Sequence, residues 1–262
     1  MPFLEIKDLK LIYPIKEGLL FPKVVKEVPA VNGVTLNIEQ GEILGLVGES
    51  GCGKSSLSKT ILQLEKATSG SVKLEGEELT HLSGSDLRRK RLDFQMIFQD
   101  PYASLNPRMT IYQTLKEAIL QRHFEWSNLE IDERIFELMD QVGLARQFIQ
   151  KYPNEFSGGQ RQRIAIARAL APEPKLIIAD EPVSALDVSI QSQILNLLKE
   201  LRDKLGLTLI FISHDLSVVR YIADKVAVMN AGKIVEYGPT EAITESPKNA
   251  YTQELLNSVL PL

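Results

Sequence analysis

The segment at residues 48–55 constrains the fold more than any other part of the sequence. It reads Gly-Glu-Ser-Gly-Cys-Gly-Lys-Ser and fits the phosphate-loop pattern GxxxxGK[ST]. An apolar run suited to a buried parallel strand precedes it, and a helical pattern begins near Lys54. Glycines let successive backbone N–H groups point at phosphate oxygens, and the helix N-terminus adds a partial positive charge. The segment therefore predicts a site for a nucleoside triphosphate.

Two side chains of this loop have distinct expected roles. Lys54 would supply a positive charge for the β and γ phosphates, and the hydroxyl of Ser55 would bind Mg²⁺. A chance match in a glycine-rich turn is the alternative, but the strand before and the helix after are both in place. The residues expected to contact the nucleotide here are Gly48, Ser50, Gly51, Cys52, Gly53, Lys54, Ser55 and Ser56.

The composition is that of a globular protein. Of the 262 residues, 44% are hydrophobic and 24% charged, and the net charge of −4 gives no overall attraction to nucleic acid or anionic lipid. The apolar runs fall short of the roughly 20 residues that span a bilayer, and the N-terminus lacks a signal-peptide pattern, so we expect the protein in the cytosol. Because Cys52 is the only cysteine, we expect neither an intrachain disulfide nor an iron–sulfur cluster.

Strand-like and helical patterns alternate along the chain. Strands are expected at residues 3–13, 31–39, 43–47, 94–98, 175–180, 207–213, 226–229 and 234–237. The first would be an edge strand, prolines between residues 14 and 30 favour an irregular arm, and residues 70–79 predict a hairpin. Apolar spacing over residues 110–143 predicts an inserted helical subdomain, and a further helix is expected at about 188–205. The alternation predicts an α/β fold with a mainly parallel sheet.

Two carboxylates, Asp180 and Glu181, follow the buried strand at residues 175–180. Open α/β sheets bind their ligands at the carboxyl ends of strands. Asp180 would hold Mg²⁺ through water, and Glu181 would polarise the water that attacks the γ-phosphate, an assistance typically worth roughly 10² to 10⁴ in rate. Taken alone, the pair could equally be a helix N-cap, and its occurrence with a phosphate loop favours catalysis.

A second glycine-rich segment, residues 157–160, precedes another helical pattern. Its sequence is Ser-Gly-Gly-Gln, in which Ser157 is expected to cap the helix. The glycines Gly158 and Gly159 would leave the first helical N–H groups accessible to an anion. An ordinary capped helix is the alternative reading of this segment in isolation.

Together these motifs resemble the ATP-binding cassette (ABC) ATPases in order and approximate spacing. The resemblance covers essentially the whole chain and rests on residues 48–55, Gln99, residues 157–160, Asp180, Glu181, residues 184–187 and His214. It implies a P-loop NTPase cassette with a mainly parallel sheet core, an N-terminal antiparallel β subdomain and an inserted α-helical subdomain. Residues 1–99 and 164–240 would form the core and β subdomain, residues 100–163 the helical subdomain with the signature motif, and residues 241–262 a short tail.

The resemblance also implies a role for each matching residue. Tyr13 would stack on adenine, and Gln99 would touch Mg²⁺ and sense a membrane partner. Ser55, Gln99 and Asp180 would be the Mg²⁺ ligands. Glu181 would be the catalytic base, and His214 would contact the γ-phosphate. The residues implied to act across a dimer interface are the signature Ser157, Gly158, Gly159 and Gln160, which would serve the partner's ATP, and Asp187 of the interface loop.

In this family two cassettes enclose two ATP molecules, each held by the phosphate loop of one and the signature of the other. This chain has one set of motifs, so the resemblance implies a second ABC ATPase, either a D-type paralogue or another copy. It further implies two transmembrane permeases, an extracytoplasmic substrate-binding protein contacted indirectly, and a peripheral location at the cytoplasmic face of the membrane. No nucleic-acid partner is expected.

Other segments are similar to one branch of the family, the oligopeptide and dipeptide importers of the Opp/Dpp type. Residues 99–110 and 181–191 carry this similarity, and residues 156–163 with the proline-flanked arm resemble the F-type ATPase. The tail at residues 247–256 is similar as well, but it has Asn-Ala where relatives tend to have His-Pro. The implied function is ATP hydrolysis coupled to peptide uptake. The alternatives are nickel or metal-chelate import and a soluble ABC ATPase outside transport. A P-loop kinase would not explain the signature or His214.

Overall fold

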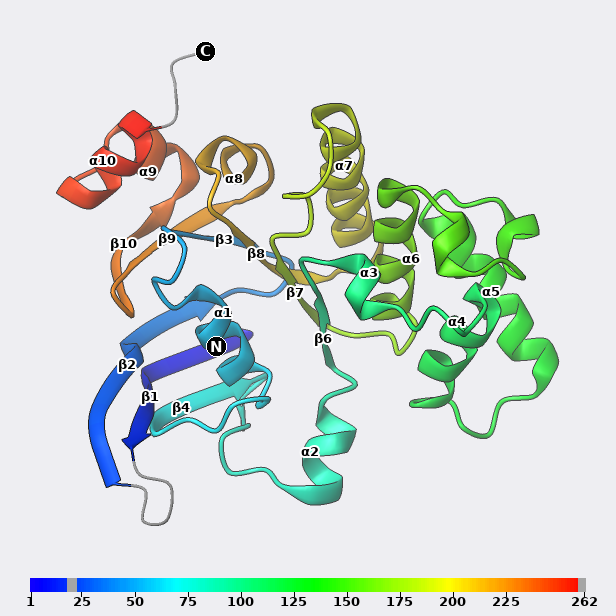
Figure 1. The fold of residues 1–262 in the computed structure, drawn as a ribbon, viewed down its shortest axis with the longest axis horizontal. Coiled ribbons are helices and arrows are strands. Elements are labelled where there is room, and N and C mark those ends of the chain that lie inside the picture. Colours follow the sequence, from blue (N-terminus) through cyan, green and yellow to red (C-terminus); the bar gives the residue numbers. More distant parts are fainter. Residues whose placement is uncertain (18–22, 259–262) are drawn as a thin grey trace. The chain divides into compact units, whose positions relative to one another are not determined.

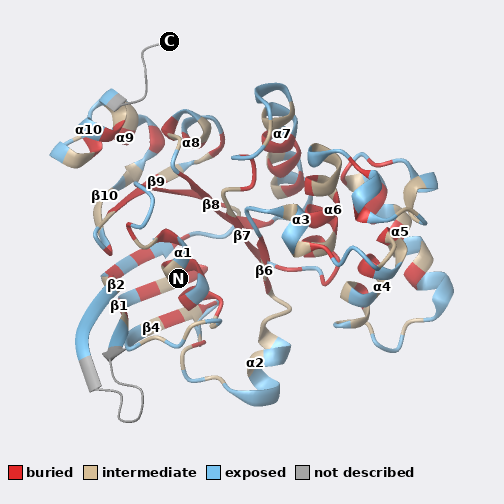
Figure 2. Ribbon diagram, viewed as in Figure 1, coloured by how far each residue is buried: buried red, intermediate tan, exposed pale blue. Residues whose placement is uncertain are grey.

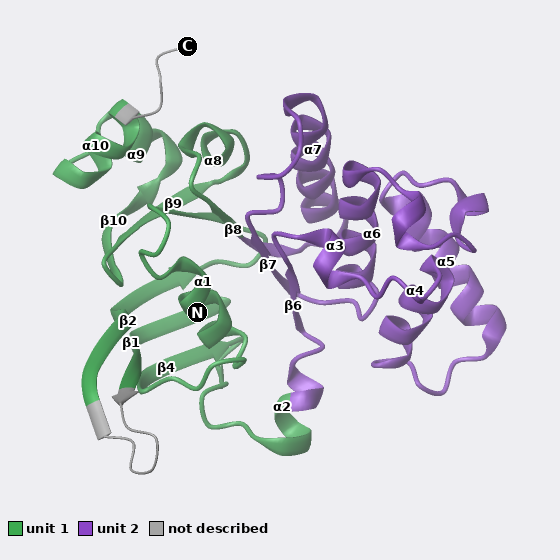
Figure 3. Ribbon diagram, viewed as in Figure 1, with its two compact units in different colours: residues 1–87, 211–262 green, residues 88–210 purple. Residues whose placement is uncertain are grey.

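The computed structural model describes residues 1–17 and 23–258 (Figure 1). Two compact units are found, one made of Met1–Leu87 and Phe211–Leu262 and the other of Arg88–Ile210 (Figure 3). Strand β8 (Thr208–Ser213) carries the chain from the second unit into the first. This division differs from the expected subdomain boundaries, which remain a prediction. No helix in the described part of the chain is long and apolar enough to cross a membrane.

The first unit contains an antiparallel sheet in the order β2-β1-β4-β5. These strands are β1 (Leu4–Glu17), β2 (Lys23–Ile38), β4 (Ser69–Leu74) and β5 (Glu77–Glu78), and β4 with β5 confirms the expected hairpin. Strand β1 pairs with β2 on one side and, as far as Lys10, with β4 on the other. The expectation of an edge strand was therefore wrong. Alternating apolar residues indicate that one face of a strand is buried, but they do not indicate how many neighbouring strands it pairs with.

The expected irregular arm at residues 14–30 was also wrong where the structure describes it. Strands β1 and β2 stay paired there, with Tyr13 opposite Val28 and Pro14 opposite Glu27. Residues 18–22 lie outside the described residues. Beyond Lys10 the described part of β1 pairs only with β2. A proline is tolerated in such a two-stranded ribbon because its missing N–H can face the unpaired side.

The strand that leads into the phosphate loop, β3 (Ile43–Val47), consists of buried residues (Figure 2). Strand β3 pairs in parallel with β9 (Lys225–Asn230), which pairs in the antiparallel sense with β10 (Lys233–Pro239). The helices of this unit are α1 (Lys54–Ile61), α8 (Leu216–Ile222), α9 (Thr240–Glu245) and α10 (Ala250–Ser258). Helix α2 (Gly84–Lys90) crosses the boundary between the units.

The second unit combines the parallel pair β6 (Phe94–Ile97) and β7 (Leu176–Asp180) with helices. The helices are α3 (Pro101–Ser104), α4 (Ile111–Leu120), α5 (Asn128–Gln141), α6 (Gly158–Leu170) and α7 (Val188–Leu205), with short 3-10 turns at Arg146–Phe148 and Pro153–Glu155. Capping boxes begin α4 at Thr110 and α5 at Ser127. The predicted α/β class with mainly parallel central strands is confirmed.

Close packing of α8 on β3 depends on Gly45. A Cβ atom at this position would lie 2.2 Å from Cγ1 of Val219 and 3.1 Å from Cβ of Ala223, both on or next to α8. These distances are well below van der Waals contact, so any side chain at residue 45 would push the helix away from the strand that leads into the phosphate loop.

We predict that Gly45→Ala lowers the free energy of unfolding by about 1–3 kcal/mol, as overpacked core positions typically do. Gly238→Ala is the matched control, because its Cβ would meet Ile243 at an ordinary 3.6 Å. Urea unfolding of both variants measures the difference. Equal midpoints for the two variants would contradict the packing argument.

Candidate functional site

The phosphate loop follows β3 along a course that only glycine permits at two positions. Gly48 has a φ of 152°, and a Cβ there would lie 2.2 Å from the carbonyl oxygen of Met229. Gly53 has a φ of 112°, and a Cβ there would lie 2.2 Å from the carbonyl oxygen of Ala30. Both positions therefore combine a left-handed backbone with a close approach of another chain segment. The fold therefore requires glycine at these two positions of the motif, independently of any ligand.

The Lys54 side chain lies inside this loop. It is 5% exposed, and its Nζ donates hydrogen bonds to the carbonyl oxygens of Gly48 at 2.6 Å and Glu49 at 2.9 Å. Its Nζ also lies 3.8 Å from Sγ of Cys52, which is buried. The structure thus brings Gly48, Cys52, Gly53 and Lys54 together as the motif predicts, with the ammonium group enclosed by the loop backbone.

Helix α1 presents uncapped backbone groups next to the loop. Its N-cap residue is Gly53, which has no side chain that could accept from the N–H groups of the first turn. Ser50, Gly51 and Ser55 are exposed. The first N–H groups of a helix carry a partial positive charge and have no intrahelical acceptor. Together with the Lys54 ammonium, they give this loop the donor groups that a phosphate requires.

Two other predicted residues of the first unit, Tyr13 and His214, are at the surface. Tyr13 is on β1 and is 37% exposed, so part of its ring is accessible for stacking. His214 is exposed and directly follows β8, where Asp215 caps α8 by accepting from the N–H of Ser217 at 2.8 Å. His214 thus projects from the carboxyl end of a buried strand, the end at which α/β sheets bind ligands.

The second unit brings Gln99 and Glu181 into contact. Strands β6 and β7 are parallel neighbours with Ile97 opposite Ala179, so the residues just beyond their carboxyl ends lie side by side. The Nε2 of Gln99 donates to Oε2 of Glu181 at 3.3 Å. Asp180 is the last residue of β7, and Glu181 follows it.

Glu181 has an unusual backbone conformation. Its φ is 46°, in the left-handed region that costs a non-glycine residue of the order of 1–3 kcal/mol. Such strained residues persist only where the surrounding structure holds them, and they are enriched at functional sites. The conformation is part of the turn that follows β7, in which the Ser184 hydroxyl donates to the Glu181 carbonyl oxygen at 3.1 Å.

The signature residues begin α6 with a capping box. The Ser157 hydroxyl accepts from the N–H of Gln160 at 3.3 Å, and the Gln160 side-chain oxygen accepts from the N–H of Ser157 at 3.0 Å. The expected N-cap at Ser157 is therefore confirmed. Both side chains already have partners in their own helix, and Gly158 beside them is exposed.

Asp187, which we expect at a dimer interface, caps the helix that contacts the signature. A Cβ at Gly159 would lie 2.5 Å from Cγ2 of Ile190, in the first turn of α7. Asp187 caps this helix by accepting from the N–H of Ile190 at 3.0 Å and from the Ser189 hydroxyl at 2.7 Å. The Ser189 hydrogen bond and then the Ile190 bond lower the pKa of Asp187, which is exposed. The second glycine of the signature is thus required for α6 and α7 to meet.

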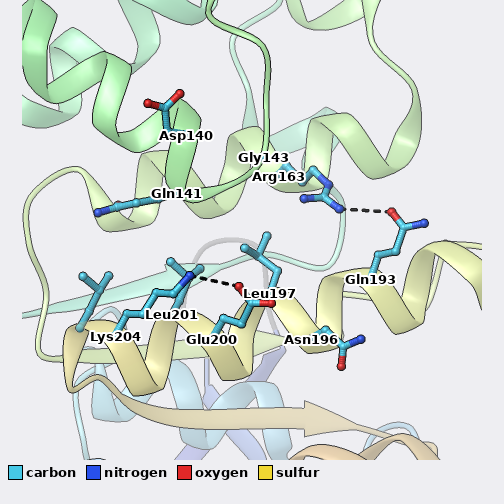
Figure 4. Close-up of a pocket in the computed structure, with 11 residues that line it drawn as sticks. Asp140, Gln141, Gly143, Arg163, Gln193, Asn196, Leu197, Glu200, Leu201 and Lys204 are labelled. Atoms are coloured by element: carbon cyan, nitrogen blue, oxygen red, sulfur yellow. Dashed lines mark hydrogen bonds and ion pairs between the residues drawn. The ribbon is translucent and has the colours of Figure 1, made fainter.

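A pocket of about 380 Å³ lies among α5, α6 and α7 (Figure 4). Arg163 crosses it from α6, donating to the Val142 carbonyl oxygen at 2.7 Å and to the Gln193 side chain at 3.2 Å. None of the residues that we expect to bind ATP lines this pocket. Arg163 links the end of α5 to α7 and thereby holds the helix that begins with the signature.

Two arginines to which the sequence analysis assigned no role join α3 to α6. Arg168, half-buried on α6, donates from Nη1 to the Ser104 carbonyl oxygen at the end of α3, and burial lowers the pKa of its guanidinium. The guanidinium of Arg161 lies 5.1 Å from the ring centroid of Tyr102. Both contacts tie the segment after Gln99 to the helix after the signature. For Arg168, the sequence signal that could have indicated this contact is a charged residue within the apolar helical pattern at residues 164–170.

Comparison with known proteins agrees with these motifs. The family model described as ABC transporter matches residues 31–184, more than half of the chain. The oligopeptide transport ATP-binding protein AppF of Bacillus subtilis is 51% identical over 257 residues, covering 98% of this chain and 78% of that protein. The oligopeptide transport ATP-binding protein OppF of Escherichia coli is 52% identical over 257 residues, covering 98% and 77% respectively.

Solved structures with the same fold are also ABC cassettes. The dimeric cassette MJ0796 in a post-hydrolysis state bound to ADP and Pi aligns with a TM-score of 0.77 and 31% identity, covering 90% of this chain and 98% of that one. The protein cbiO1 of Clostridium perfringens, part of an ABC transporter complex, aligns with a TM-score of 0.82 and 26% identity over 99% and 96% of the two chains. The chain therefore belongs to the ABC transporter family and is one of its ATP-hydrolysing cassettes.

Proposed function

We propose that this cassette powers an importer of oligopeptides or dipeptides. The observation that supports its ATPase role is the contact between Gln99 and Glu181 at the carboxyl ends of two parallel strands. The support for a peptide cargo is the similarity, along 98% of the chain, to ATP-binding proteins of oligopeptide transport. The cargo itself would pass through partner permeases, so this chain would supply free energy and make no contact with the peptide.

Glu181 is the proposed general base. Its carboxylate would accept a proton from the water that attacks the γ-phosphate, and the amide nitrogen of Gln99 would hold that carboxylate in place. Lys54 and the N–H groups of residues 48–56 would hold the β and γ phosphates, and His214 would contact the γ-phosphate. Tyr13 would stack on the adenine ring.

The proposed Mg²⁺ ligands are Ser55, Gln99 and Asp180. A hydroxyl, an amide oxygen and a carboxylate are hard oxygen donors of the kind that Mg²⁺ takes together with water and phosphate. The orientation of Gln99 supports its part in this set, because its nitrogen contacts Glu181 and its amide oxygen would be the atom that binds the metal. When bound, the metal would neutralise charge on the phosphates.

The proposal includes a second ABC ATPase, either a D-type paralogue or another copy of this chain. The signature at residues 157–160 would serve the partner's ATP, and Asp187 would lie at the interface. That MJ0796 forms a dimeric cassette supports this arrangement. Two permeases and an external binding protein would complete the transporter, with this chain at the cytoplasmic face of the membrane.

Coupling to the permeases would use the segment between Gln99 and the signature. We propose residues 100–163 as the helical subdomain that transmits the movement. The contacts that support this role are those of Arg168 with the Ser104 carbonyl oxygen and of Arg161 with Tyr102. Through them, a displacement of α3 would be passed to α6 and hence to the signature.

The role of Glu181 is tested by Glu181→Gln. We expect nucleotide binding to persist while phosphate release falls by roughly 10² to 10⁴, because the amide cannot accept the proton. The matched control is Glu173→Gln, since Glu173 also has a left-handed φ, of 53°, but belongs to no proposed site. The control should hydrolyse ATP at the wild-type rate.

Lys54→Ala is measured beside Glu181→Gln to distinguish loss of nucleotide binding from loss of ATP hydrolysis. This variant should lose nucleotide binding itself, whereas Glu181→Gln should retain it. Phosphate release by Glu181→Gln within twofold of wild type would contradict its assignment as the base.

The coupling role is tested by Arg168→Met in the assembled transporter. We expect the ratio of permease-stimulated to basal ATPase activity to fall, together with a stability loss of about 1–3 kcal/mol from the unpaired Ser104 carbonyl group. Arg146→Met is the control, because Arg146 is an exposed arginine of the same unit that pairs with Asp140. A stimulation ratio for Arg168→Met equal to that of Arg146→Met would refute the proposed coupling.

A further inference from the structure

The C-terminal tail contacts the phosphate loop in the first unit. The Tyr251 hydroxyl, on the first turn of α10, accepts a hydrogen bond from the backbone N–H of Glu49 at 3.1 Å. These two residues are 202 positions apart in the sequence. Burial, the largest influence, raises the pKa of Tyr251, so its hydroxyl stays neutral at physiological pH.

The tail is held firmly enough to position this hydroxyl. The carboxylate of Glu236, on β10, accepts from the N–H groups of Lys248 at 2.8 Å and Asn249 at 3.1 Å. On the inner side of α10, Thr252 is fully buried and Leu255 is 7% exposed. The start of the helix is therefore fixed to the sheet on which the loop is built.

Asn249 adds a local cap. Its side-chain oxygen accepts from the Tyr251 N–H at 2.9 Å, and its amide nitrogen donates to the Val235 carbonyl oxygen at 3.4 Å. Asparagine is favoured at such a position because it accepts from a backbone N–H two residues on. Asn249 thus orients the turn that carries Tyr251.

The peptide unit that Tyr251 contacts is the one that also holds Lys54. The N–H of Glu49 and the carbonyl of Gly48 belong to a single planar peptide group. Tyr251 binds this group at its N–H end, and Lys54 Nζ binds it at its carbonyl end at 2.6 Å. Rotation of the peptide would therefore move the acceptor of the lysine that we expect to bind phosphate.

We propose that Tyr251 is a positioning residue for ATP binding, which acts through the peptide between Gly48 and Glu49 to set the phosphate loop and Lys54. This inference rests on the proposed role of residues 48–56 in holding the nucleotide. The tail would then contribute to nucleotide binding through the backbone of the phosphate loop.

Tyr251→Phe tests the inference because it removes only the hydroxyl. Loss of one intramolecular hydrogen bond should raise the KM for ATP and the Kd for Mg-ADP by about threefold to tenfold. The kcat should stay within twofold of wild type, since no group that touches the reacting atoms is changed. Hydrogen exchange of the Glu49 amide should accelerate in the nucleotide-free protein, a readout that does not depend on activity.

Tyr237→Phe is the matched control. Its hydroxyl also bonds a backbone group of the same unit, the Asn37 carbonyl oxygen at 2.9 Å, but makes no contact with the loop. It should leave KM, Kd and Glu49 exchange unchanged. Asn249→Ala should reproduce a part of the Tyr251→Phe effect by loosening the start of α10.

Unchanged KM and Kd in Tyr251→Phe would overturn the inference. So would a loss of thermal stability with no change in nucleotide affinity, because that result would show a purely structural role. If the wild-type protein itself bound no Mg-ADP, the proposed function would fail along with the inference. Wild-type binding with an unaffected Tyr251→Phe variant would refute the inference alone.

Discussion

The close approach of two backbone carbonyl groups to the phosphate loop is the constraint on which the first unit depends. The oxygens of Met229 and Ala30 occupy the space that side chains at Gly48 and Gly53 would need. The loop is therefore built into its unit by contacts with β9 and β2. The Gly232 N–H adds a third contact by donating to the Cys52 carbonyl oxygen at 2.9 Å. A preformed loop loses little conformational entropy when it receives phosphates.

Backbone pairing also positions the candidate catalytic residues of the second unit. Gln99 and Glu181 meet because β6 and β7 are parallel neighbours that end at the same level. Gly159 allows α6 to pack on the start of α7, beside Asp187. In both units, strands and helix ends determine where the side chains of the candidate site lie.

Local sequence patterns predicted the elements well. The helix at residues 188–205, the parallel strands and the cap at Ser157 have signatures within a few residues, and the structure contains each of them. The errors concerned pairing: the strand at residues 3–13 is not at an edge, and the proline-containing arm is paired. Strand pairing depends on distant segments, and proline spacing does not reveal whether a strand has an unpaired side.

The contiguous motifs of the candidate site could be recognised from local sequence alone, whereas Tyr13, Gln99 and His214 were expected only through the family resemblance. The phosphate loop, the Asp180-Glu181 pair and the signature were found because their residues are neighbours in the chain. Tyr251 and Arg168 were not assigned roles, because each acts on a backbone group far away in the sequence, namely the Glu49 N–H and the Ser104 carbonyl group. No spacing rule links a tyrosine in a tail to a peptide 202 positions earlier.

Backbone amide NMR during titration with Mg-ADP tests the central claim, that the loop at residues 48–56 holds the nucleotide, most directly. We predict large shifts of the amide resonances of residues 49–55, because their N–H groups would donate to phosphate oxygens. The amides lining the pocket among α5, α6 and α7 should change little. Saturable shifts confined to that pocket, with unchanged loop resonances, would show that the nucleotide does not bind at residues 48–56.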